Sequence, residues 1–165
     1  MIVKTIEVER FSVTSSKPFE AVVSALEAAV GKPEMVEFAK AIGAARTLDE
    51  LERAVRAGLG KTGLMMFMKL DHGAIVRKES GSDTARNVRL LIGNPLIMKE
   101  IVKHVPDAGS YAPVTILVDE RRYGVHLSYD TMASHLRSYG NTQALAVAVD
   151  LDSKIESLLR ESAAD

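Results

Sequence analysis

The sequence predicts a single α+β domain with a mainly antiparallel sheet, and three observations support this prediction. The chain has 165 residues, the usual size of one domain. Its 47% hydrophobic and 26% charged residues are typical of a globular protein. Strand-like segments, two of them close enough to form a hairpin, are combined with amphipathic helical segments. We therefore expect residues 1–165 to form one domain.

Strand patterns occur in six places along the chain. Each shows alternating apolar residues or a short apolar run bounded by turn residues. The run at 64–70 is apolar on both faces, so we expect a central strand covered on two sides and not an edge strand. The polar segment 119–124 separates the last two strands and indicates a hairpin. The predicted strands are residues 2–13, 64–70, 74–78, 88–92, 114–118 and 125–129.

Helical spacing of apolar residues accounts for most of the remaining chain. Hydroxyl residues and Pro18 mark the start of the first helix. Thr47 and Glu50 have the spacing of a capping box, in which each side chain accepts from the other's backbone N–H. A short helix is expected around His135, and a loop at 106–113. The predicted longer helices are residues 19–30, 33–45, 48–57, 95–104 and 142–160.

Charge and composition exclude several classes of function. The 21 Lys and Arg residues balance 22 Asp and Glu residues, so long-range attraction to phosphate backbones is absent and we expect no nucleic-acid partner. The absence of cysteine excludes disulfides, thiolate catalysis and cysteine metal sites. Charged residues interrupt the N-terminal segment where a signal peptide needs an apolar run, and no window approaches the roughly 20 apolar residues of a membrane span. We expect a cytoplasmic protein that does not enter a membrane.

Metal and nucleotide motifs are weak in this sequence. The tripeptide at 60–62 resembles the end of a phosphate-binding loop, but Val55 replaces its leading glycine and the segment runs from helix to strand, the reverse of that motif. The four histidines lack the His-x-x-x-His spacing of helical metal ligands. Alternation places Met65 opposite Met66 and Met68, so these thioethers do not form one cluster. We expect no metal site, and the residues identify no cofactor.

The candidate binding residues lie at strand ends, where polar groups are exposed on a rigid frame. Asp71 and His72 follow the predicted strand 64–70, Asn94 begins the helix after strand 88–92, and Tyr129 and Asp130 end strand 125–129. Turn and capping chemistry explains the same residues without a ligand. We expect the corner at 93–95 and the Asp-His strand end to be neighbours.

The order of several motifs resembles the domain of unknown function 302 family. They are Leu-Ile-Gly-Asn-Pro-Leu-Ile-Met-Lys at 91–99, Tyr-Ala-Pro at 111–113, His-Leu-Ser-Tyr-Asp at 126–130, Leu-Asp-Ser-Lys at 151–154, the Asp-His dipeptide at 71–72 and Ser-Lys-Pro-Phe at 16–19. The resemblance implies a β-α-β4-α core, a curved antiparallel sheet like the saddle of the TATA-box-binding protein with helices on one face. It also implies a homodimer, which the neutral charge permits, and it implies no activity. The helices at 33–60 look like an insertion relative to shorter members.

Three hypotheses for function follow. The first is a non-enzymatic homodimeric module that binds a small molecule in an apolar cleft, with the five candidate residues at its polar rim. The second is an enzyme in which Asp71 and His72 form an acid–base pair and Tyr129 donates a proton, although neighbours in an extended segment point to opposite faces. The third is a regulatory protein that docks a partner through the helices at 33–60.

Overall fold

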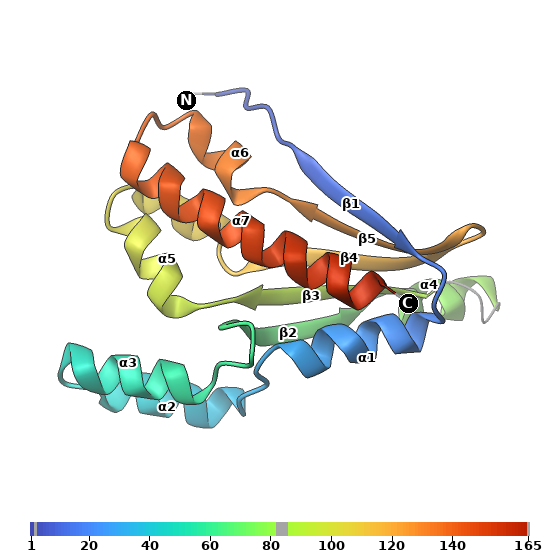
Figure 1. Cartoon of the computed structure of the whole chain (residues 1–165), viewed down its shortest axis with the longest axis horizontal. Coiled ribbons are helices and arrows are strands. Elements are labelled where there is room, and N and C mark those ends of the chain that lie inside the picture. The colour runs from blue at the N-terminus through green and yellow to red at the C-terminus, as the bar shows by residue number, and fades with distance from the viewer. Residues whose placement is uncertain (2, 82–85, 165) are drawn as a thin grey trace.

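The computed structural model describes residues 1, 3–81 and 86–164, and it confirms the α+β class with one open antiparallel sheet. The five strands lie in the order β1-β5-β4-β3-β2, and every neighbouring pair is antiparallel (Figure 1). The elements in chain order are β1 Arg10–Ser15, α1 Phe19–Ala29, α2 Met35–Ala44, α3 Leu48–Ala57, β2 Met65–Asp71, α4 His72–Ser80, β3 Asn87–Gly93, α5 Pro95–Val102, the 3-10 helix η1 Pro106–Tyr111, β4 Val114–Arg121, β5 Gly124–Asp130, α6 Met132–Arg137 and α7 Thr142–Ala163.

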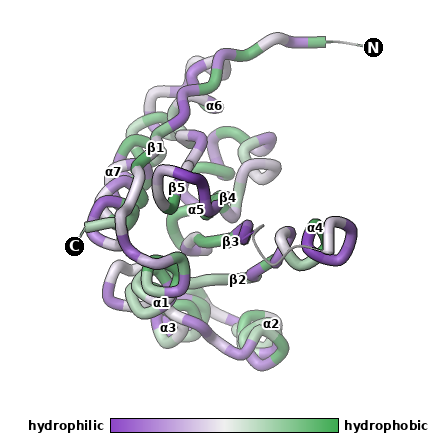
Figure 2. The backbone as a smooth tube through the Cα atoms, turned by 90° about the vertical axis from the view of Figure 1, so that its right-hand side faces the viewer, coloured by the Kyte–Doolittle hydropathy of each residue, from purple (hydrophilic) through white to green (hydrophobic). Residues whose placement is uncertain are grey.

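The sheet has one face covered by helices and one more open face. In β4, Val114, Ile116 and Val118 are buried, whereas the alternating Thr115 and Leu117 are only half-buried. The helices α1 and α7 lie on the covered side, and α4 lies on the other side (Figure 2). The prediction that the first and last helices seal the apolar side of the sheet is therefore confirmed.

The element boundaries predicted most accurately are those of helices with local capping signals. The helix α3 spans the predicted residues, and its capping box is present: Glu50 N–H donates to Thr47 Oγ1, and Glu50 Oε2 accepts from Thr47 N–H. The β4–β5 hairpin is confirmed as well. The predicted loop at 106–113 contains η1, and the short helix around His135 is α6.

Two strand predictions are wrong in extent or type. The strand predicted at 2–13 begins only at Arg10, because β5 ends at its partner Asp130, and Ile2 lies outside the described residues. The segment predicted as a strand at 74–78 belongs to the helix α4. Asp71 caps this helix by accepting from the Ala74 N–H, and Gly81 ends it with a positive φ of 65°.

The prediction of a central strand at 64–70 is also wrong, since β2 is an edge of the sheet. Its apolar first half is covered by other parts of the chain. Gly31 pairs with Met65 through backbone hydrogen bonds, and the ring of Phe67 meets the ring of Phe38 from α2. Coverage by these segments, and not by a neighbouring strand, explains why the run is apolar on both faces.

Among the described residues, no helix combines the length and the apolar character that crossing a membrane requires.

Candidate functional site

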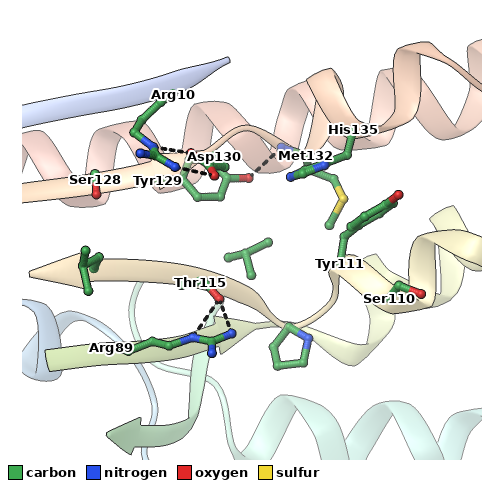
Figure 3. A pocket seen from close by; sticks show the side chains of 13 residues that line it. Arg10, Arg89, Ser110, Tyr111, Thr115, Ser128, Tyr129, Asp130, Met132 and His135 are labelled. Carbon is green, nitrogen blue, oxygen red and sulfur yellow. Dashed lines mark hydrogen bonds and ion pairs between the residues drawn. The ribbon is translucent and has the colours of Figure 1, made fainter. Parts of the chain in front are cut away.

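A sizeable cavity lies where β4 and β5 separate. The two strands pair from the hairpin only as far as Ile116 and Tyr129. Beyond that point Asp130 pairs with Arg10 of β1, and Thr115 pairs with Leu91 of β3. The opening holds a cavity of about 410 Å³, closed at one end by η1 and α6 (Figure 3). Its lining residues are Arg10, Arg89, Ser110, Tyr111, Pro113, Val114, Thr115, Leu117, Ser128, Tyr129, Asp130, Met132 and His135.

Arg89 supplies a positive charge to this cavity. Its side chain projects from β3, is half-buried, and donates through Nε and Nη2 to the Thr115 hydroxyl at 3.3 and 3.0 Å. Among the described residues, no carboxylate forms an ion pair with Arg89. A neutral hydroxyl only partly offsets the cost of removing a guanidinium from water. The cavity therefore contains a fixed, fork-shaped donor that an anion can satisfy.

A second arginine at the rim is already paired. Arg10 donates to Asp130 through two bonds of 2.5 and 2.8 Å. The hydrogen bond from Arg10 holds the pKa of Asp130 below its usual value, so this carboxyl is charged at neutral pH. The pair adds no net charge, which leaves Arg89 as the unbalanced guanidinium of the cavity.

Aromatic side chains form the end wall. The Tyr111 ring stacks on the His135 imidazole with centroids 4.4 Å apart and an angle of 14° between the planes. The Tyr111 and Tyr139 hydroxyls are 3.5 Å apart, and this hydrogen bond raises the pKa of Tyr139 to about 12. His135 Nδ1 is buried without a hydrogen-bond partner in the part of the chain that the structure describes. The wall thus offers flat apolar surface, and the unpaired ring nitrogen lies buried behind it.

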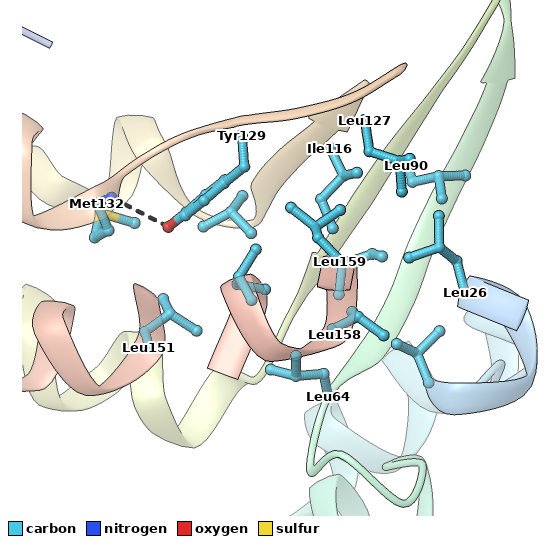
Figure 4. Close-up of a cluster of buried hydrophobic side chains, with 14 of the residues drawn as sticks. Leu26, Leu64, Leu90, Ile116, Leu127, Tyr129, Met132, Leu151, Leu158 and Leu159 are labelled. Carbon is cyan, nitrogen blue, oxygen red and sulfur yellow. Dashed lines mark hydrogen bonds between the residues drawn. The ribbon is translucent and has the colours of Figure 1, made fainter. Parts of the chain in front are cut away.

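Tyr129 faces the helices and holds the floor of the cavity in place. Its hydroxyl donates to Asp152 of α7 at 2.5 Å, and Asp152 also accepts from the backbone N–H groups of Met132 and Ala133. Figure 4 shows the ring within the apolar core and its contact with Met132. Burial, followed by the nearby Asp152 carboxylate, raises the pKa of Tyr129 well above its ordinary value. This phenol therefore remains protonated and structural at neutral pH.

The structure separates the residues that the sequence analysis expected around one cleft. Tyr129 and Asp130 line the cavity, but Asp71 and His72 lie at the opposite end of the sheet edge, because Met65 pairs with Gly93 and Asp71 pairs with Val88. The expectation that the Asp-His strand end and the corner at 93–95 are neighbours is wrong. A seven-residue strand, about 20 Å long, separates them.

The separated residues have their own structural roles. The Asp71 carboxylate accepts from the Ala74 N–H at 2.8 Å and from Arg77 at 3.0 Å, and these contacts lower its pKa, the backbone bond most strongly. His72 is exposed and lines neither this cavity nor the one beside Asn94. Asn94 accepts from the Leu96 N–H and donates to the Gly63 carbonyl. The geometry therefore gives no support to an Asp71–His72 acid–base pair.

Sequence reasoning did not select Arg89, Tyr111 or Asp152. A signal exists for two of them: Arg89 is a charged residue inside an apolar strand, and Asp152 occupies a position of the apolar stripe of α7, between Ala148 and Ile155. Tyr111 belongs to the Tyr-Ala-Pro motif of the family resemblance, but only the tertiary fold stacks it on His135 of α6. Within the described residues, no group of three His, Asp or Glu side chains could hold a metal ion.

The fold places this chain among small α+β proteins with one open antiparallel sheet backed by helices, and in this chain a mixed polar and apolar cavity lies between two diverging strands. The chain belongs to the DUF302 family, since the model of this domain of unknown function matches residues 43–162. It is similar in fold to the crystal structure of an uncharacterized conserved DUF302 protein from Bacillus stearothermophilus, with a TM-score of 0.66 and 11% identity over 94% of this chain and 98% of that one. A comparison with curated proteins finds no match.

Proposed function

We propose that this protein is a non-enzymatic, homodimeric module that binds a small organic anion in the cavity between β4 and β5. The observation that carries the proposal is the half-buried Arg89, whose guanidinium has a hydroxyl partner but no carboxylate among the described residues. A bound carboxylate would supply the missing negative charge in a geometry that matches the guanidinium fork.

The remaining wall of the cavity supports an organic anion over a bare inorganic one. Pro113, Leu117 and Met132 contribute apolar surface, and Tyr111 presents a flat ring against His135. Small-molecule sites usually combine such apolar walls with a few convergent polar groups. The volume of about 410 Å³ lies in the range of known ligand pockets.

Two features support the homodimer. The net charge of −1 gives little repulsion between copies. The edge strand β2 and the adjoining α4 expose apolar side chains, with 49% of Met68, 71% of Ile75 and 46% of Val76 accessible. An exposed apolar sheet edge is a surface on which a second copy can pair. Sedimentation equilibrium of the wild type and of Ile75→Glu tests this part, and a monomeric wild type would contradict it.

The binding proposal is tested with propionate as the probe. We expect chemical shifts of the Thr115 and Leu117 amides to change saturably on titration. Arg89→Gln should weaken binding about 10- to 100-fold, because charge-assisted hydrogen bonds contribute about 1.5–3 kcal/mol. The matched control is Arg122→Gln, which removes the same charge from the exposed turn at the other end of the β4–β5 hairpin. The proposal would be contradicted if Arg89→Gln and Arg122→Gln lost the same affinity for propionate, or if the wild type showed no saturable chemical-shift change.

A second candidate function is the docking of a partner through α2 and α3. The observation that favours it is that α2 buries none of its residues and leaves 60% of Val36 accessible. The matching experiment is a pull-down from cell extract with Val36→Glu and wild-type protein. Loss of a captured partner in the variant, with unchanged propionate binding, would support this role.

A further inference from the structure

A second, smaller cavity lies directly beside the anion cavity. Its volume is about 140 Å³, and it is formed at the junction of the β3 end, α5 and the start of β4. An apolar protein cavity of about 150 Å³ is large enough to bind benzene. Apart from Asn94, its lining is apolar or glycine: Phe67, Gly93, Pro95, Ile97, Met98, Ile101, Ala112, Pro113, Val114, Met132 and Leu151.

The two cavities share part of their walls. Pro113, Val114 and Met132 line both of them. The Met132 side chain extends toward Tyr111 at the end of the anion cavity (Figure 3). Met132 is buried in the core, and its unbranched side chain can adopt other rotamers, so it is the adaptable part of the shared wall.

The Arg89 anchor and the shared wall residue Pro113 lie close together. Thr115 holds the Arg89 guanidinium, and Pro113 is two residues earlier on the same chain segment. Two residues of extended chain cover about 7 Å. A carboxylate and an aromatic ring joined by two methylene groups span a comparable length.

We propose that the ligand is an amphipathic carboxylate whose anionic end binds Arg89 and whose apolar end, of about the size of a phenyl ring, enters the second cavity past Met132. This inference rests on the proposed function, since it uses Arg89 as the anchor. It adds the class of ligand: an aryl or short branched alkyl acid, and not a simple polar anion.

Gly93 offers a direct way to fill the second cavity. A Cβ at this position would lie 3.5 Å from the Pro113 Cβ and 3.6 Å from the Phe67 ring, which are ordinary contacts. Its φ is not positive, so an L-residue is compatible with the backbone. Gly93→Ala therefore narrows the cavity without distorting β3, and Gly93→Val fills more of it. Gly109→Ala is the matched control, because its Cβ would meet nothing within 4 Å.

The experiment compares propionate with 3-phenylpropionate by NMR titration of the full chain. We expect wild-type protein and Gly109→Ala to bind the phenyl ligand at least about 10-fold more tightly, since each methylene in an apolar pocket contributes about 10-fold or more. Gly93→Ala should reduce this advantage and Gly93→Val should abolish it, with propionate binding unchanged. Arg89→Gln should weaken both ligands.

The outcomes separate the two proposals. If neither acid binds the wild type, the anion site itself is wrong, and this inference is wrong with it. If propionate binds but the phenyl group adds no affinity, only the second cavity is refuted. The same conclusion follows if Gly93→Val retains the full advantage of the phenyl ligand while its methyl spectrum shows a folded protein.

Discussion

Asp152→Ala is the most informative test of how the structure maintains the cavity. Asp152 lies on α7 with only 7% of its surface accessible. Its carboxylate accepts from the Tyr129 hydroxyl at 2.5 Å, from the Met132 N–H at 2.8 Å and from the Ala133 N–H at 2.9 Å. These bonds attach the first turn of α6 to α7, so Asp152 acts as a helix cap supplied by a distant part of the chain.

The expected loss of stability follows from the donors that lose their acceptor. Met132 N–H keeps one partner, because it also donates to the Tyr129 oxygen at 3.1 Å. The Ala133 N–H and the Tyr129 hydroxyl are left without one. Each buried unsatisfied donor costs about 1–3 kcal/mol, and removal of the carboxylate also relieves its own desolvation, so we expect a net loss of about 3 kcal/mol. Tyr129→Phe removes the bond that the hydroxyl donates to Asp152 and the bond that it accepts from the Met132 N–H, but it leaves no donor unsatisfied, because Met132 N–H still donates to Asp152, so it should cost about 1.5 kcal/mol.

Urea unfolding followed by circular dichroism measures these losses. Both variants should lower the midpoint while the dependence on urea stays unchanged, because the surface exposed on unfolding is the same. The double variant should lose less than the sum of the single variants, since the two residues share a bond. Ser153→Ala, an exposed neighbour on α7, is the control and should stay within about 0.5 kcal/mol of wild type. A loss below about 1 kcal/mol for Asp152→Ala, or strict additivity, would refute the capping role.

Two further predictions concern Tyr129 and the tight glycine contact near the start of β2. The pKa of Tyr129 is raised above 10.0 by burial and by Asp152, so its protonated form favours the fold. The contribution of this pKa shift to the free energy of unfolding is complete below about pH 10. Above that pH it falls by about 1.4 kcal/mol per pH unit. Unfolding midpoints from pH 9 upward should therefore decline more steeply for wild type than for Tyr129→Phe, and parallel profiles would contradict this. A Cβ on Gly60 would lie 2.4 Å from the Gly31 nitrogen, so Gly60→Ala should cost about 2 kcal/mol or more by urea unfolding, whereas Gly43→Ala, which has open space, should not destabilise. Equal stability of the two alanine variants would mean that the Gly31–Gly60 contact is looser than the structure has it.

Local signals made the helices predictable, and misleading local signals produced the main error. Thr47 and Glu50 are three residues apart and cap each other, so α3 could be placed from the sequence alone. In α4, the branched residues Ile75 and Val76 favoured a strand. Asp71 and Gly81 were equally visible in the sequence. They favour the helix, because Asp71 accepts from a backbone N–H at its start and the Gly81 N–H donates to a backbone carbonyl at its end.

The cavity depends on contacts that no local pattern encodes. Alternation predicts that Thr115 and Leu117 share a face of β4, but it does not say that the helix on this side, α4, packs on β3 and leaves β4 more open (Figure 2). The point at which β4 and β5 separate depends on where β5 turns into α6. That turn is fixed by Asp152, some 20 residues further along the chain. Arg89, Tyr111 and His135 therefore meet only in the folded protein.

The neutral composition and the proposed anion site are compatible because they act over different distances. At physiological ionic strength the Debye length is about 8 Å, so most of the chain's 22 acidic residues do not influence an anion in the cavity. Within hydrogen-bond distance of Arg89, a partly desolvated site weakens screening and the local guanidinium dominates. A nucleic acid requires many such charges along a surface, whereas this cavity offers one guanidinium beside the already neutralised Arg10–Asp130 pair. The charge balance therefore disfavours long polyanions and leaves room for one small acid.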